Sequence, residues 1–256
     1  MESNRTLKVF DDPEKLAFGA ARYIAGLLDE GHSSENKFSM ALSGGSTPTR
    51  LYEILAEEPF KSTVNWERVE FFWVDERCVP PSEKGSNYWL VNELLLRKIY
   101  IPSENVHRIR GELSQEEAVS DYRSELISYF TGHDVSFDLV ILGFGEDGHT
   151  AALFPGSKEI SDVRSLVLPT EGTYEDRPSK RITLGLRALN QSRNVIVLGT
   201  GVSKADIVKK VFLDKDSELP VSKISPEEGR LIWLLDKDAA RSLPDRFLSQ
   251  SSCWSL

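Results

Sequence analysis

The sequence predicts an α/β fold built on a mostly parallel sheet flanked by helices. Apolar runs of strand length alternate along the 256 residues with segments whose apolar positions recur at helical spacing. This alternation implies right-handed crossovers, which place successive strands parallel. Neither a repeat nor a linker-like stretch interrupts it, so we expect one domain over residues 1–256.

The strand candidates are apolar runs, most of them nearly continuous. Continuous runs are typical of strands buried on both faces of a sheet, whereas alternation indicates one buried face. The alternating candidate is residues 38–42; the continuous ones are 69–74, 137–142 and 194–198, with 181–186 and 230–235 as further candidates.

Helices are expected between these strands. Residues 16–28 carry one apolar stripe at helical spacing. Ser114 and Glu117 form a capping box that opens a second striped helix. Ser203 with Asp206 marks the start of another.

Charge and composition limit the classes of binding partner that we expect. Hydrophobic residues make up 40% and charged residues 28%, which is ordinary for a globular chain. The formal net charge of −9 argues against nucleic acid or an anionic membrane as the main partner. A basic pocket for an anionic small molecule remains compatible with this balance.

The cysteines and the chain ends bear on location. Cys78 and Cys253 form no C-x-x-C motif, which favours a reducing compartment. Residues 1–15 lack the apolar core of a signal peptide, so we expect a cytoplasmic protein. Residues 253–256 have the outline of a prenylation box, but the polar Ser255 fits it badly, and we interpret the match as chance.

A glycine turn follows the first strand candidate. Gly44 and Gly45 allow the backbone to approach a ligand closely, with Thr47 expected as the helix N-cap and Pro48 at the first helical position. The N–H groups at such a helix start, near Ser46, suit a phosphate. A plain strand-to-helix turn needs the same residues, so both interpretations stay open.

Three charged residues, Asp75-Glu76-Arg77, directly follow the strand candidate at 69–74. Ligands of parallel sheets bind outside the carboxyl ends of the strands. The triplet therefore either places a carboxylate and a guanidinium beside the glycine turn or forms a solvated loop with an internal ion pair. Ser86 or Asn87 is expected to cap the helix that follows.

A second glycine loop, residues 143–150, contains G-x-G-x-x-G directly after a strand candidate. A dinucleotide site is disfavoured by the position past mid-chain, by the bulky Phe144 and by two acidic residues in the loop. Pro155-Gly156 also breaks the chain soon afterwards, which leaves no long helix for a pyrophosphate.

His149 closes this loop and is the candidate general base. The other histidines, at positions 32, 107 and 133, lie in turn-like surroundings. Asp147 can fix the tautomer of His149 or raise its basicity. A structural role, the usual one for a single histidine, is the alternative.

Two basic residues complete the set. Arg181 opens the strand candidate at 181–186. Lys204 lies at a helix start, where a cation is unfavourable beside the helix dipole unless an anion compensates it. A solvated lysine with a small penalty is the alternative.

Several segments in combination carry a family resemblance. They are ALSGGSTP at 41–48, WVDERCVP at 73–80, SNY at 86–88, FDLVILGFGEDGHTAALFPGS at 137–157, KRITL at 180–184 and Gly201-x-x-Lys204. In this order they resemble the 6-phosphogluconolactonases, within the family that also includes glucosamine-6-phosphate deaminases. The resemblance implies a Rossmann-like α/β fold, of the type shared with ribose-5-phosphate isomerase and CoA transferases.

The resemblance implies hydrolysis of a sugar-phosphate lactone, 6-phosphoglucono-1,5-lactone, to 6-phosphogluconate, without a cofactor or a metal. The deaminase branch follows its histidine with a pattern like His-x-Ala-Phe-Asn-Glu, and here the apolar Phe154 stands at the acidic position. Deaminases also tend to have Asp-Glu-Tyr where this chain has Asp75-Glu76-Arg77. Both differences favour the lactonase branch.

On this hypothesis His149 takes a proton from the attacking water and Asp147 orients it. Arg77, held by Asp75, stabilises the oxyanion, although Asp75 can instead bind a sugar hydroxyl. The phosphate-binding candidates are Gly44, Gly45, Ser46, Thr47, Arg181 and Lys204.

Two rivals stay open: an isomerase or deaminase on the same fold, and a non-catalytic sugar-phosphate sensor. A monomer is the default expectation, and residues 172–180 are a candidate lid.

Overall fold

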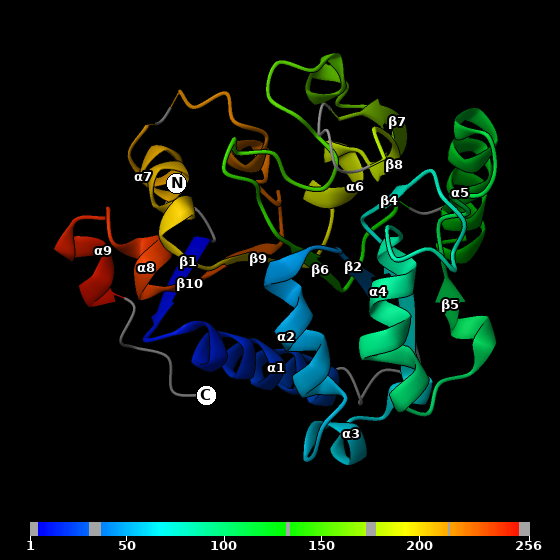
Figure 1. Ribbon diagram of the computed structural model, residues 1–256, viewed down its shortest axis with the longest axis horizontal. Helices are drawn as coiled ribbons and strands as arrows, with labels where there is room; N and C mark the ends of the chain where they lie inside the picture. Colours follow the sequence, from blue (N-terminus) through cyan, green and yellow to red (C-terminus); the bar gives the residue numbers. More distant parts are fainter. Residues whose placement is uncertain (1–4, 31–36, 132–133, 173–177, 215, 251–256) are drawn as a thin grey trace.

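The computed structural model describes residues 5–30, 37–131, 134–172, 178–214 and 216–250, and a seven-stranded parallel sheet forms its centre (Figure 1). Across the sheet the strands are β1 (Arg5–Phe10), β10 (Arg230–Asp236), β9 (Asn194–Gly199), β6 (Leu139–Leu142), β2 (Phe38–Leu42), β3 (Val69–Trp73) and β5 (Val106–His107). Every neighbouring pair in this order is parallel, as the sequence predicts.

A smaller antiparallel sheet stands beside the main one, with the order β4 (Asp75–Arg77), β8 (Lys180–Leu184) and β7 (Val167–Glu171). Its first strand directly continues the chain beyond β3. The small sheet therefore extends from the carboxyl end of a central strand, which is the edge where the candidate site residues lie.

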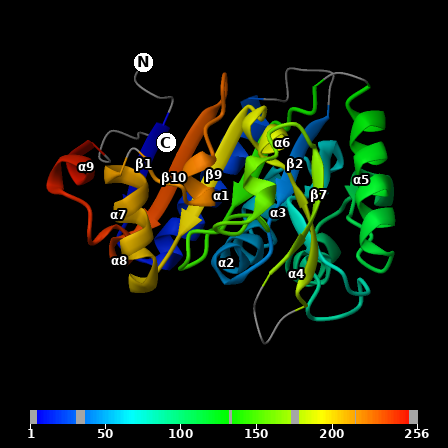
Figure 2. The same ribbon diagram turned by 90° about the horizontal axis from the view of Figure 1, so that it is seen from above.

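Helices cover both faces of the main sheet. In Figure 1, α1 (Pro13–Glu30), α2 (Ser46–Leu55) and α3 (Phe60–Thr63) lie on one side, and α6 (Leu186–Asn190) and α7 (Ala205–Leu213) lie on the other. Figure 2 shows α5 (Gln115–Tyr129) at one end of the molecule, beyond β7. The remaining described helices are α4 (Asn87–Leu94), α8 (Lys237–Ala240) and α9 (Asp245–Gln250).

The core forms where the sequence places its apolar runs. All four residues of β6 are buried, and the stripe on α1 buries Leu16, Ala20 and Ile24 at 1% exposure or less. Full burial of a large apolar side chain stabilises the fold by about 1.5–3 kcal/mol. The phenol of Tyr122 on α5 both accepts from the backbone N–H of Trp73 and donates to its carbonyl, which fixes this helix against β3.

Helix starts test the capping predictions. The capping box of Ser114 and Glu117 is confirmed at the start of α5, and Ser86 is the N-cap of α4. Thr47 as an N-cap is wrong: α2 begins at Ser46, and Gly45 takes the cap position at φ 99°, a backbone conformation that glycine adopts without strain.

Two further elements differ from expectation. The strand predicted at 181–186 is β8, but it belongs to the antiparallel sheet, because it pairs with β4 on one side and β7 on the other. The helix start predicted at Ser203 is one turn of 3₁₀ helix, Val202–Lys204, after which α7 begins with Lys204 as its N-cap residue. Strand β1 lies outside the predicted set.

Candidate active site

The candidate residues gather at one edge of the main sheet. Strands β9, β6, β2 and β3 are consecutive neighbours and parallel, so their carboxyl ends lie side by side. The segments that leave these ends are residues 200–204, 143–150, 43–47 and 74–77. These four segments therefore leave the main sheet at the same edge.

His149 and Asp147 form the central pair. The Nδ1 atom of His149 lies 2.6 Å from Oδ1 of Asp147, and the imidazole side chain is 21% exposed. Burial raises the pKa of Asp147, but the hydrogen bond and charge of His149 outweigh this and lower it to about 2. The carboxylate is therefore ionised near neutral pH and only accepts hydrogen bonds. It follows that Nδ1 of a neutral His149 carries the hydrogen and Nε2 the basic lone pair.

The loop around this pair has no spare room at Gly145. A Cβ atom added to Gly145 would overlap with the imidazole of His149 and with the carboxylate of Asp147. The backbone closes on itself here, since the N–H of Gly145 donates to the carbonyl of His149 at 2.8 Å. Gly148 takes φ 85°, and its carbonyl accepts from Val221. The G-x-G-x-x-G pattern thus shapes a histidine loop.

Phe154 lies next to the imidazole. Its ring centroid is 5.3 Å from that of His149, with 42° between the planes. The guanidinium carbon of Arg181 lies 5.7 Å from the same phenyl centroid. This ring therefore connects the loop after β6 to strand β8.

Strands β4 and β8 bring two arginines together. In their antiparallel register Arg77 stands directly opposite Arg181, and Asp75 opposite Thr183. Arg181 is 3% exposed. Like charges placed directly opposite each other in a strand pair repel, so an anion near this pair would be stabilising.

The expected ion pair between Asp75 and Arg77 is not formed in the described part of the chain. Nη1 of Arg77 instead donates to the carbonyl of Gly85 at 2.5 Å, because its long side chain reaches the loop that precedes α4. Asp75 is 5% exposed, and burial together with the charge of Asp75 raises the pKa of Tyr52. Asp75 is thus packed on the core side of the site.

The glycine turn after β2 exposes the start of α2. Gly45 and Ser46 are exposed, and no side chain caps this ten-residue helix. The first turn also carries no acidic residue, so its partial positive charge is not offset locally. This is the geometry that the phosphate-cradle interpretation requires.

Lys204 lies near the histidine loop. Its ammonium is 5.6 Å from the ring centroid of Phe144. Burial lowers the pKa of Lys204, while the charges of Glu146 and Asp147 oppose that shift. The lysine therefore sits within electrostatic reach of the carboxylate that holds His149.

Two residues of this edge lie outside the predicted set. Nδ2 of Asn87 donates to the backbone carbonyl of Asp75 at 2.8 Å, and its buried side chain packs against Gly44 so closely that a Cβ there would overlap with it. The sequence marks Phe154 only as an apolar residue in place of an acid. It marks Asn87 only as a helix-cap candidate and as part of the SNY segment.

Glu76 has a structural role instead. Its carboxylate accepts from the backbone N–H groups of Arg77, Asn87 and Tyr88 and from the hydroxyl of Ser86. Burial raises the pKa of Glu76 more than these hydrogen bonds lower it. The middle residue of the charged triplet therefore holds the start of α4.

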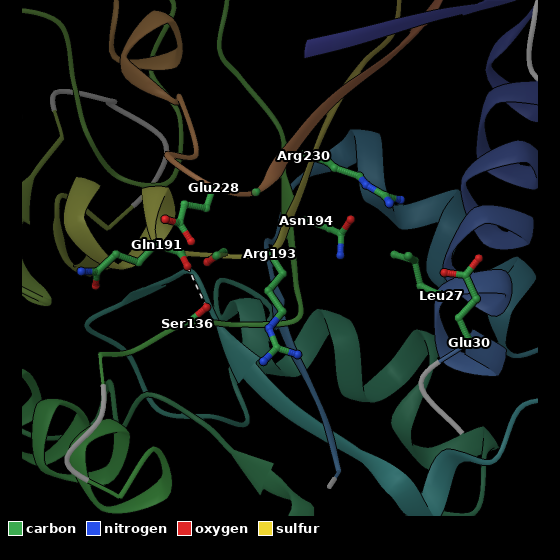
Figure 3. A pocket seen from close by; sticks show the side chains of 10 residues that line it. Leu27, Glu30, Ser136, Gln191, Arg193, Asn194, Glu228 and Arg230 are labelled. Carbon is green, nitrogen blue, oxygen red and sulfur yellow. Dashed lines mark hydrogen bonds between the residues drawn. The ribbon is translucent and has the colours of Figure 1, made fainter. Parts of the chain in front are cut away.

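A polar hollow of about 420 Å³ lies elsewhere, at the amino ends of β9 and β10 (Figure 3). Asn194 and Arg230, which begin these strands, line it, and Glu30 reaches it from α1. Since the candidate residues occupy the carboxyl ends, this hollow is separate from them.

The described residues contain no group of three or more His, Cys, Asp or Glu side chains that could hold a metal ion. Nor do they include a helix with the length and apolar character that a membrane crossing requires. Reaction without a metal stays a prediction. Most of the candidate lid, residues 173–177, and the end of the chain at 253–256 lie outside the described residues.

The fold is that of an α/β protein with a parallel sheet, a class in which ligands bind outside the carboxyl ends of the strands. Residues 11–233 match the family described as glucosamine-6-phosphate isomerases/6-phosphogluconolactonase, and the chain belongs to this family. The resemblance identified from the sequence segments is thereby confirmed.

Individual relatives agree with this assignment. The chain is 39% identical to a 6-phosphogluconolactonase of Haemophilus influenzae, covering 80% of this chain and 87% of the relative. It is 35% identical to the 6-phosphogluconolactonase of Rattus norvegicus, with 96% of each chain covered. The solved 6-phosphogluconolactonase of Trypanosoma brucei is 31% identical, with a TM-score of 0.85 over 94% of this chain and 99% of that one.

A monomeric glucosamine-6-phosphate deaminase has a TM-score of 0.80 over 93% of this chain and 99% of its own, at 20% identity. This likeness shows a shared fold only.

Proposed function

We propose that the protein hydrolyses 6-phospho-D-glucono-1,5-lactone to 6-phospho-D-gluconate in the oxidative pentose phosphate pathway. The observation that carries this proposal is the His149–Asp147 pair, held 2.6 Å apart at the edge where basic side chains gather. A lactone is an electrophilic ester, so water needs only a base, a stabilised oxyanion and a fixed substrate. The relatives named 6-phosphogluconolactonase support the same substrate.

In the proposed mechanism Nε2 of His149 takes a proton from water as its oxygen bonds to C1 of the lactone. The tetrahedral oxyanion then collapses, the bond from C1 to the ring oxygen breaks, and His149 returns the proton to that oxygen. One water is added, and the base is regenerated. Acid–base help from a positioned group is worth about 10²–10⁴-fold in rate.

The anionic groups of the substrate are assigned to the basic side chains. We place the 6-phosphate at the amides of Gly44, Gly45, Ser46 and Thr47, with Arg181 and Lys204 supplying positive charge. Arg77 is assigned to the oxyanion. Holding the phosphate far from C1 positions the carbonyl against the base. Asp75, packed beneath this edge and, within the described residues, not paired with Arg77, is assigned to a sugar hydroxyl.

The deciding experiment follows freshly prepared lactone, with spontaneous hydrolysis subtracted. The wild type should consume it far faster than buffer, and His149→Ala should lose kcat by about 10²–10⁴-fold. Binding of 6-phosphogluconate to the variant, measured by calorimetry, should stay near wild type. Near-normal turnover by His149→Ala would remove this residue from the mechanism.

Two outcomes would favour other functions. Ammonia release from glucosamine 6-phosphate would make the protein a deaminase. Binding of 6-phosphogluconate without lactone turnover would make it a sensor.

We also infer a single lactonase domain over residues 1–256, acting as a monomer in the cytoplasm. One continuous core from Leu16 to Leu243 supports the single domain, and the unpaired thiol of Cys78 supports a reducing compartment. A rice relative, 38% identical, is named chloroplastic, so cell fractionation is the test of location. Light scattering on the purified chain tests the monomer.

A further inference from the structure

The ring of Phe154 touches two groups to which the proposed mechanism gives different tasks. Its centroid is 5.3 Å from the imidazole centroid of His149, the proposed base. It is also 5.7 Å from the guanidinium carbon of Arg181, a proposed phosphate ligand. His149 comes from the loop after β6 and Arg181 from β8, so this ring is a direct packing link between two separate elements.

The ring is itself firmly placed. Gly172 backs it, since a Cβ there would lie 2.8 Å from Cζ of Phe154. The turn before it is fixed by a hydrogen bond from the N–H of Leu153 to the carbonyl of Thr150 at 2.9 Å, and Ala151 takes φ 52°. The N–H of Ser157 donates to the carbonyl of Phe154 at 3.1 Å. The backbone on both sides of Phe154 is thus hydrogen-bonded and Gly172 lies against its ring, so the ring can restrain the groups that pack on it.

We propose that Phe154 is a positioning residue that sets the imidazole plane of His149 and the place of the Arg181 guanidinium relative to one another. This inference rests on the proposed lactonase function. The inference goes beyond that function because it gives a role to a residue whose side chain has no titratable or hydrogen-bonding atoms.

The need for such a residue follows from the geometry of the imidazole. The hydrogen bond from Nδ1 to Asp147 fixes one corner of the ring. That bond fixes the position of Nδ1, but a tilt of the ring plane would still turn Nε2 away from the water. Contact with the Phe154 ring restricts this tilt. A misplacement of about 1 Å can cost about 10²-fold in rate.

The guanidinium needs the same restraint for a different reason. It stands opposite Arg77 in the strand register, where the two positive charges repel. An aromatic ring attracts a cation placed near its face, so Phe154 stabilises the Arg181 guanidinium without carrying a charge itself. Leucine at this position would fill part of the volume but would supply no such attraction.

The test compares Phe154→Leu and Phe154→Tyr with Phe18→Leu, a control on α1 whose 45% exposed ring packs on Phe60. We expect Phe154→Leu to lower kcat by about 10- to 100-fold and to raise KM several-fold, because both the base and the phosphate ligand lose their restraint. Phe154→Tyr, which keeps the ring, should restore both constants to near wild type. Phe18→Leu should change neither.

A spectroscopic measurement separates positioning from simple loss of stability. In wild-type protein the ¹⁵N spectrum of His149, assigned by its absence in His149→Ala, should show one tautomer with the proton on Nδ1. In Phe154→Leu these signals should broaden, because the imidazole samples more than one orientation, at a temperature where circular dichroism still reports a folded chain. Unchanged His149 signals or a wild-type kcat in Phe154→Leu would overturn the inference.

Failure of the inference and failure of the proposed function are distinguishable. If the wild type does not hydrolyse the lactone, the proposed function fails. If it does, and Phe154→Leu is as active as Phe18→Leu, only the positioning role fails.

Discussion

His149 donates from Nδ1 to Oδ1 of Asp147 over 2.6 Å, and the same oxygen accepts from the backbone N–H of His149 at 3.1 Å. One carboxylate oxygen therefore fixes both the side chain and the main chain of the candidate base. An amide in place of the carboxylate can present an N–H group to Nδ1 and favour the opposite tautomer.

Asp147→Asn should consequently reduce kcat by about 10²–10⁴-fold, since the proton would move to Nε2 and block the base. KM should change little, because no phosphate ligand is removed. Initial rates of lactone hydrolysis measure both constants. Asp134→Asn is a matched control, because that aspartate is 69% exposed and pairs with Arg187. Equal activity of the two variants would contradict the orienting role.

The pH dependence of turnover isolates the imidazole. Because His149 holds the pKa of Asp147 at about 2 against the effect of burial, this carboxylate stays ionised throughout the accessible range. Turnover should therefore fall as the pH is lowered from about 8 to about 5, and the cause should be protonation of a histidine. A rate profile without slope across that interval would argue against a histidine base.

Gly145→Ala should inactivate the site by steric means alone. The added methyl would occupy the space of the imidazole and of the Asp147 carboxylate, so both must move. We expect a loss of about 10²-fold or more in kcat. Gly143→Ala is the control from the same loop, since a Cβ there meets no atom within 4 Å. Comparable losses in the two variants would indicate general damage to the loop.

The two facing arginines allow the proposed roles to be separated. Arg181→Gln should raise KM by about 10- to 100-fold, the worth of a hydrogen bond to a charged group, whereas Arg77→Gln should mainly lower kcat. Because the residues are opposite each other in the register, the double variant should show coupling. A rise in KM for both single variants, with kcat unchanged, would move Arg77 from the oxyanion to the phosphate.

Local features of the sequence predict most of the main sheet. The runs at 69–74 and 137–142 contain little but apolar side chains, and a strand buried on both faces is their natural structure. Strand β1 gives no such signal, because all of its residues are only half-buried and Arg5 and Lys8 interrupt its apolar positions. An apolar run reveals a strand only where both of its faces are buried, and β1, the outermost strand on its side of the main sheet, is not buried in this way.

The sequence predicts which residues belong to the site, but it does not predict which of them contact one another across distant segments. The sequence indicates Asp147 with His149 because they are two positions apart. The opposition of Arg77 and Arg181 depends on an antiparallel pairing between distant segments, which no local spacing encodes. The same holds for Phe154 beside Arg181 and for Asn87 beneath Gly44. The Gly45 N-cap escaped prediction because side-chain capping rules favour Thr47.

Stability should depend on pH through a second histidine, away from the site. His107, on β5, lies 2.7 Å from Oε2 of Glu70 through Nε2 and 2.6 Å from Oε1 of Glu125 through Nδ1. Both nitrogens face carboxylates, so the imidazolium fits better than the neutral ring. Burial lowers the pKa of His107, but the two glutamates outweigh it and the net shift is upward. For Glu70 the signs are reversed. Burial raises the pKa of this carboxyl, but His107 and Lys37 lower it by more, so the net shift is downward.

A raised histidine pKa contributes stability below the unfolded value of about 6.5, and this is lost as the pH rises through the folded value. Because the pKa of Glu70 is lowered in the folded chain, this carboxylate contributes stability above about pH 4.5. That stability is lost as the pH falls through the folded pKa of Glu70. The pair should therefore stabilise the fold most between about pH 4.5 and 6.5. His107→Gln should reduce the free energy of unfolding by about 1 kcal/mol at pH 6 and by less at pH 9, a modest figure because Glu125 is half exposed. Urea unfolding at the two pH values measures this, and a larger loss at pH 9 would reverse the assignment.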